Sequence, residues 1–254
     1  MTDCILKNLK MKDSLISLNM ENKEKEQETI KKWFNQTYSL RGFFYLRPVR
    51  AYRIFPSLLE FKPDHKVLDV ACGLGRLLEA SQEYGSELHG FDISDVAVEK
   101  AKKILPQAHI QVANAEEMPY ADNTFDRITC LGSLERMIDL EKVLKEIKRV
   151  AKPDAKVLFL VRNINGWSWK LTKNILRTKV KASHQGAKSQ EEWTSLFNKI
   201  GFEIKEILPD QYPIKKRQLF TSLGLKKIDY KKVSKAMFPM EYVHEYIYIL
   251  DNSK

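Results

Sequence analysis

Hydrophobic residues recur along this chain in two alternating patterns. Short apolar, β-prone runs indicate buried strands, and between them lie longer segments with apolar residues at helical spacing. Strands are expected at 66–70, 88–91, 109–112, 127–131, 156–161, 202–208 and 246–250, and helices at 76–84, 95–105, 140–151 and 190–200. This alternation is typical of a parallel sheet with helices on both faces. We therefore predict an α/β fold with a doubly wound, Rossmann-like sheet of seven mostly parallel strands.

The first predicted strand runs straight into a glycine turn. Gly73 and Gly75 allow a tight turn and a close approach of the backbone to a ligand, and a helical apolar face begins immediately afterwards. A second acid, Asp92, ends the next predicted strand, 23 residues after Asp69. A glycine turn after one strand and a carboxylate after the next are the layout of a nucleotide site in a doubly wound sheet.

The residues around this turn distinguish between nucleotides. Asp69 precedes Gly73 and Gly75 in the order Asp-x-x-x-Gly-x-Gly, and an acid in the loop suits a ligand with an ammonium and a sulfonium group better than a pyrophosphate. The pattern resembles the class I S-adenosylmethionine (SAM) dependent methyltransferases, including the small-molecule enzymes of the ubiquinone-biosynthesis type. Segments 111–126, 144–157 and 192–202 resemble further motifs of that family in the same order. The resemblance covers roughly 66–209 and implies SAM as cofactor and an antiparallel last strand near 245–250.

The resemblance also implies a role for individual residues. Asp69 and the 71–75 backbone would face the methionine end of SAM, Asp92 would bind both ribose hydroxyls, and Ile93 would pack on the adenine. Asn114 stands where the family usually has an aspartate that accepts from the adenine amino group, and asparagine keeps an acceptor oxygen. The implied cofactor-binding set is Asp69, Ala71, Gly73, Gly75, Asp92, Ile93, Asn114, Ala115, Glu116 and Leu131.

Catalysis is expected near Glu135 and Arg136, where many relatives have a Glu-His pair. Arginine cannot act as a base at neutral pH, but it can pair with Glu135 or clamp an anionic acceptor. Glu135 and His184 are the candidate catalytic residues, with a surface-loop histidine as the alternative for His184; Arg136 and Trp167 are candidate substrate-binding residues. No group of residues has metal-ligand spacing, so no metal is expected, and the histidines near the early strands (His65, His89 and His109) are interpreted as structural.

The chain divides into three predicted parts. Residues 1–20 are expected to form a disordered or frayed leader, with Met20 as an alternative start. Residues 21–61, with an aromatic-rich stretch at 33–46, are expected to form a helical lid over the cofactor; the alternative is plain helical packing on the sheet. Residues 62–254 form the SAM-binding domain, with insertions at about 163–188 and 210–244 that cap the substrate or, alternatively, thicken the sheet edge or make a dimer contact.

Charge narrows the choice of acceptor. The net charge is +10, and residues 162–240 hold 17 Lys or Arg against 6 Asp or Glu, which favours an anionic substrate or, alternatively, a solvated surface.

No apolar run is long enough to span a membrane, and three cysteines without metal spacing favour the cytoplasm. We predict a monomeric or homodimeric methyltransferase acting on O or N of a small, anionic or lipid- or sugar-type acceptor, without specific nucleic-acid binding. The alternatives are an RNA or protein methyltransferase and a non-catalytic SAM-binding protein.

Overall fold

The computed structural model describes the backbone of residues 2–166, 186–210 and 239–252, and side chains within these ranges from residue 21 onward. The helices are α1 (Thr2–Arg41), α2 (Ile54–Leu58), α3 (Arg76–Ser81), α4 (Asp95–Ile104), α5 (Leu140–Val150) and α7 (Gln190–Ile200). The strands are β1 (Lys66–Val70), β2 (Glu87–Asp92), β3 (His109–Val112), β4 (Phe125–Leu131), β5 (Ala151–Arg162), β6 (Glu203–Pro209) and β7 (Glu245–Asp251). Short 3-10 turns lie at Gly42–Tyr45, Val49–Tyr52, Gln82–Tyr84, Leu134–Arg136 and Met240–Tyr242.

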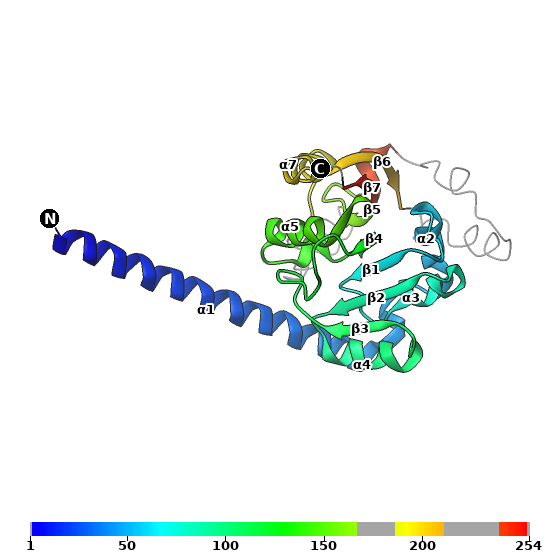
Figure 1. The fold of residues 1–254 in the computed structure, drawn as a ribbon, viewed down its shortest axis with the longest axis horizontal. Coiled ribbons are helices and arrows are strands. Elements are labelled where there is room, and N and C mark those ends of the chain that lie inside the picture. Colours follow the sequence, from blue (N-terminus) through cyan, green and yellow to red (C-terminus); the bar gives the residue numbers. More distant parts are fainter. Residues whose placement is uncertain (1, 167–185, 211–238, 253–254) are drawn as a thin grey trace, which may run out of the picture.

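The seven strands form one sheet in the order β3-β2-β1-β4-β5-β7-β6 (Figure 1). Strands β1 to β5 pair in parallel, and β7 lies antiparallel between β5 and β6. This confirms the predicted Rossmann-like sheet with an antiparallel last strand. The strand order reverses between β1 and β4, and ligands of such sheets bind beyond the carboxyl ends of the strands at that point.

Two apolar cores lie on opposite faces of the sheet. Helices α5 and α7 bury residues such as Leu144 and Trp193 against one face, and α2, α3 and α4 bury residues such as Leu78 and Ala101 against the other. Polar caps set where the helices begin: Ser94 accepts from the Ala97 amide at the start of α4, and Ser189 forms a capping box with Glu192 at the start of α7.

Two details differ from the sequence prediction. Residues 48–61, expected to be helical as part of the 21–61 lid, form two short pieces, a 3-10 turn (Val49–Tyr52) and α2, with Pro56 in the first turn of α2, where its missing N–H costs no helical hydrogen bond. Strand β5 begins at Ala151 instead of residue 156 because residues 152–155 bulge out between the pairs Phe125–Ala151 and Arg127–Lys156.

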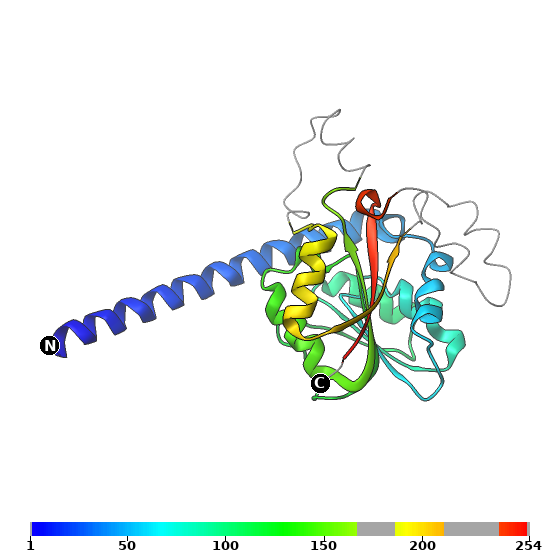
Figure 2. The same ribbon diagram turned by 90° about the horizontal axis from the view of Figure 1, so that it is seen from above.

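Helix α1 leaves the body of the protein at its amino-terminal end and packs on it at its carboxyl-terminal end (Figures 1 and 2). It is helical from Thr2, through the residues expected to form a leader, and the three-part division of the chain stays a prediction. Its carboxyl-terminal part is fixed to α4: Ser94 Oγ donates to Asn35 Oδ1 at 2.6 Å, and Lys100 Nζ donates to the Tyr38 carbonyl at 2.7 Å. No helix in the described ranges combines the length and the apolar character that crossing a membrane requires.

Candidate functional site

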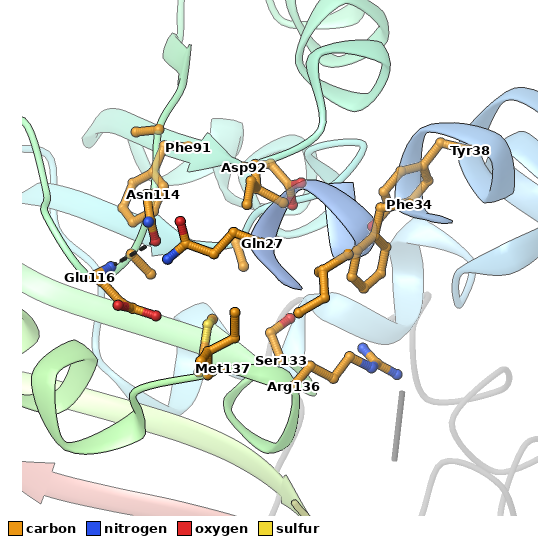
Figure 3. A pocket seen from close by; sticks show the side chains of 16 residues that line it. Gln27, Phe34, Tyr38, Phe91, Asp92, Asn114, Glu116, Ser133, Arg136 and Met137 are labelled. Atoms are coloured by element: carbon orange, nitrogen blue, oxygen red, sulfur yellow. Dashed lines mark hydrogen bonds between the residues drawn. The ribbon is translucent and has the colours of Figure 1, made fainter. Parts of the chain in front are cut away.

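Two adjoining clefts open at the carboxyl ends of the central strands. The first cleft has about 600 Å³ of empty space and is lined by residues from α1, the β1 and β2 ends, the loop after β3 and the turn after β4 (Figure 3). Its lining residues are Gln27, Ile30, Phe34, Tyr38, Ala71, Phe91, Asp92, Ile93, Ala113, Asn114, Ala115, Glu116, Ser133, Arg136, Met137 and Ile138. The second cleft has about 1020 Å³ and shares Tyr38, Ala71, Ser133 and Arg136 with the first.

Asp92 organises the first cleft. Its two oxygens accept hydrogen bonds from the backbone amides of Gly73 (2.8 Å) and Ser94 (2.9 Å), which tie the glycine turn to the start of α4. Burial outweighs these bonds and raises the pKa of Asp92 to about 6. A carboxylate held by backbone amides at the edge of a cleft is suited to accept hydrogen bonds from the hydroxyl groups of a sugar.

The glycine turn has the backbone conformation that its sequence predicts. Gly73 and Gly75 have φ values of 52° and 74°, and a Cβ atom on Gly75 would lie 2.8 Å from Leu105 Cδ1. Ala71 also has a positive φ, 56°, at a position that lines both clefts. The turn therefore needs glycine for both conformation and space.

Asp69 lies one residue before the end of β1 and lines the second cleft. Thr129 Oγ1 donates to Asp69 Oδ1 at 2.7 Å, but burial raises the pKa of Asp69 to about 7, and the charge of Asp92 adds to this rise. A buried carboxyl group of this kind gains its charge most easily when a cation binds beside it.

The loop after β3 forms another wall of the first cleft. Asn114 Oδ1 accepts from the Glu116 amide at 3.0 Å, so this oxygen has one local partner and one further lone pair for a ligand (Figure 3). Glu116 Oε1 accepts from the Asp139 amide at 3.2 Å, and Ala115 and Ile93 complete this part of the cleft.

The second cleft differs from the first in its larger number of arginine side chains. Arg47, Arg76, Arg136 and Arg162 line it, together with the carboxyl groups of Asp69 and Glu245. Arg47 bridges Asp210 and Glu245 at 2.6 Å each. The Nε atoms of Arg76 and Arg162 are buried and have no hydrogen-bond partner among the described residues. Buried donors without partners favour an anion.

The candidate catalytic and substrate residues lie in different places. Arg136 lines both clefts, donates to the Gly132 carbonyl at 2.6 Å and lies over the Phe34 ring at 5.8 Å. Glu135 lines neither cleft; it is 3% exposed, neither carboxyl oxygen has a partner within the described residues, and burial raises its pKa. Trp167, His184 and most of both insertions lie outside the described residues. The assignments of site residues stay predictions.

Sequence reasoning did not single out several lining residues. Phe34 and Tyr38 of α1 belong to the aromatic stretch that was expected to cover the cofactor. No pattern in the sequence marked Gln27 as a residue of the site. Arg47, Arg76 and Arg162 are far apart in the chain, and only the sheet brings them together. The expectation of no metal rested on spacing along the chain, and the pairing of β2 with β3 brings Glu87, His89 and His109 together in a way that this spacing does not show.

Comparison with known proteins agrees with this geometry. Residues 68–159 match the family model of a methyltransferase domain. The chain is 38% identical over 112 residues to a demethylmenaquinone methyltransferase of Bacillus mycoides, covering 41% of this chain and 47% of the relative. It is 28% identical over 159 residues to a ubiquinone biosynthesis O-methyltransferase of Coxiella burnetii, covering 59% and 67%. The chain thus spans about half to two thirds of the length of these relatives.

A solved structure shows the same fold. A putative methyltransferase from Bacillus halodurans superposes with a TM-score of 0.56 at 20% identity, covering 81% of this chain and 99% of that one. The strand order, the glycine turn and these matches make the chain similar to the class I methyltransferases, with residues 68–159 as the part that matches a methyltransferase domain.

Proposed function

We propose that this protein transfers the methyl group of SAM to an oxygen or nitrogen atom of a small anionic acceptor held in the second cleft. The adenosine part of SAM would occupy the first cleft, with its ribose on Asp92 and its adenine beside Ile93 and Asn114. Its positively charged methionine end would reach into the second cleft, near Asp69 and the glycine turn and next to the acceptor. The supporting observation is the set of four arginines in the second cleft, two of which keep a buried Nε atom without a partner in the described ranges.

Methyl transfer from a sulfonium is an in-line displacement, in which the acceptor atom forms a bond to the methyl carbon as the bond to sulfur breaks. The positive charge on sulfur disappears, so the protein has no new anion to stabilise, and its contribution is alignment and exclusion of water. The wall that both clefts share, which includes Tyr38, Ser133 and Arg136, is where the two reactants would meet.

An anionic acceptor also reduces the need for a base. A neutral hydroxyl must lose its proton during transfer, whereas an ionised oxygen already has the lone pair free. Position 136 holds arginine, which cannot accept a proton, but its positive charge favours an ionised acceptor at this wall. A reaction that needs no base is consistent with an arginine at position 136, where many relatives have a histidine.

The test is a SAM-consumption assay over paired acceptors that carry the same hydroxyl or amino group and differ only in a neighbouring carboxylate or neutral carboxamide, and including the demethylmenaquinone named for one relative. The ionised member of a pair should turn over faster. Arg162→Gln should raise the KM of that acceptor roughly tenfold and change SAM affinity much less, because Arg162 lines the second cleft and no part of the cleft assigned to the adenosine of SAM.

Arg53→Gln is the matched control, since Arg53 lines neither cleft. Equal turnover of charged and neutral acceptors, with an unchanged KM in Arg162→Gln, would exclude the anionic-acceptor proposal. SAM binding without turnover on any acceptor would favour a non-catalytic protein instead.

A further inference from the structure

A second cluster of functional side chains lies where β2 and β3 pair. The parallel register places His89 directly opposite His109, and the two imidazole rings stack with centroids 4.7 Å apart and planes at 24°. Glu87, two residues before His89 on the same side of β2, brings its Oε1 atom to 2.7 Å from His89 Nε2. One potential ligand atom from each of the three residues lies within 4.8 Å of the others.

The surroundings hold two of these side chains in place. The His89 ring is half-buried, with the Phe125 ring 5.3 Å and the Tyr120 ring 6.0 Å from it, both edge-on. Lys66 Nζ lies 3.4 Å from the other oxygen of Glu87 and so orients that carboxylate.

We propose that Glu87, His89 and His109 form a binding site for a divalent transition-metal ion of the zinc type. Two imidazoles and a carboxylate are a donor set that suits zinc, and the harder ions magnesium and calcium prefer oxygen ligands alone. Donors about 2.0–2.2 Å from a zinc ion lie within about 4 Å of one another, so a small rotation of the exposed His109 ring brings the cluster to that spacing. Water would complete the coordination.

The cluster lies away from the methyl-transfer site. Glu87 begins β2 and Asp92 ends it, so the two sites lie at opposite ends of one strand. His109 begins β3, a strand of four residues at the edge of the sheet. An ion held by β2 and β3 together would fix this short edge strand in its register and would add to stability, and it would not take part in transfer. This inference is independent of the acceptor proposed above.

The experiment is a zinc titration of the full chain after removal of metal, followed by calorimetry and by thermal unfolding. One ion should bind per chain and raise the unfolding temperature. His109→Ala should weaken zinc binding at least tenfold and abolish the thermal shift. Glu87→Gln should weaken it several-fold, because the amide keeps an oxygen donor but loses the charge. Since His109 is exposed, its replacement should leave the far-ultraviolet dichroism unchanged.

His65→Gln and Glu99→Gln are the matched controls, because each removes a possible donor that does not belong to the cluster, and both variants should bind zinc as the parent does. Unchanged affinity in His109→Ala would overturn the proposal. Loss of zinc binding in a control variant would overturn it too. A titration that does not saturate at a defined stoichiometry would also overturn it and would show an adventitious ion only.

Discussion

The hydroxyl group of Tyr38 lies directly over Gly73. A Cβ atom on Gly73 would lie 2.7 Å from Tyr38 Oη, closer than such atoms approach in folded proteins. Tyr38 belongs to α1 and Gly73 to the turn after β1, so this contact closes α1 onto the loop that we assign to the methionine end of SAM.

We expect Gly73→Ala to lower SAM affinity at least tenfold, because the added methyl group must displace either Tyr38 or the turn. In a Tyr38→Phe background, which removes the hydroxyl, part of the affinity should return. Gly42→Ala is the control for backbone strain alone, since Gly42 also has a positive φ (49°) but no atom within 4 Å of the added Cβ. Calorimetry on the parent, the three single variants and the Gly73→Ala/Tyr38→Phe double variant measures the effect, and an equal loss in both backgrounds would contradict the Tyr38 contact.

Asp92→Ala should also lower SAM affinity at least tenfold. Each hydrogen bond from a ribose hydroxyl to this carboxylate is worth about 1.5–3 kcal/mol in gross terms, and about 1.4 kcal/mol corresponds to a factor of ten. Asp64→Ala, which removes an exposed carboxylate away from both clefts, is the control. Unchanged affinity in a folded Asp92→Ala protein would show that the ribose binds elsewhere.

Affinity for SAM should rise with pH between 6 and 7.5. The pKa of Asp69 is raised to about 7 in the free protein, so at pH 6 the group is about 90% protonated and must lose that proton to pair with a cationic ligand. We expect about tenfold tighter binding at pH 7.5 than at pH 6. In Asp69→Asn this dependence should shrink to the smaller contribution of Asp92, whose pKa is about 6.

The same pKa shift affects stability with the opposite sign. Because the folded pKa of Asp69 lies above its unfolded value of about 3.9, the free protein should lose stability as pH rises from about 4 to 7. The increase in unfolding temperature on adding SAM should therefore grow over that range. A SAM-induced shift that is independent of pH would contradict the assignment of Asp69 to the cationic end of the cofactor.

The sheet could be predicted from sequence to within a few residues at most strand ends, because most of its strands are apolar or β-prone runs bounded by turns. Strand β3, for example, has the predicted bounds, and β1 ends where the glycine turn begins. Local pattern could not place residues 152–155, whose bulge depends on pairing with β4. It also could not show that the helical turns before β1 break at Arg53.

The residues expected to bind the cofactor could be predicted from sequence, because they follow one another in a fixed local order, from Asp69 to Gly75 and again at Asp92. Among the arginines of the second cleft, Arg47, Arg76 and Arg162 carry no such signal, because they come from different parts of the chain that meet only in the folded protein. His109 likewise reaches Glu87 and His89 only through the pairing of β2 with β3, which local sequence does not fix.

Methyl transfer should survive removal of divalent metal. The Glu87–His89–His109 cluster is at the far end of β2 from Asp92, and within the described residues no other such group of possible ligands occurs. Turnover should be unchanged after EDTA treatment, while the unfolding temperature falls if zinc was bound. Loss of turnover with EDTA and recovery with magnesium would place a metal in the transfer step.

Because the two clefts share one wall, release of the cofactor and release of the methylated product should be coupled. Tyr38 and Arg136 line both clefts, and α1 is tied to α4 through Asn35 and the Tyr38 carbonyl. If spent cofactor leaves the first cleft past α1, this end of the helix has to loosen, and that loosening would also open one side of the acceptor cleft. We expect sequential kinetics in which the methylated product departs before S-adenosylhomocysteine, at a rate that slows as solvent viscosity rises.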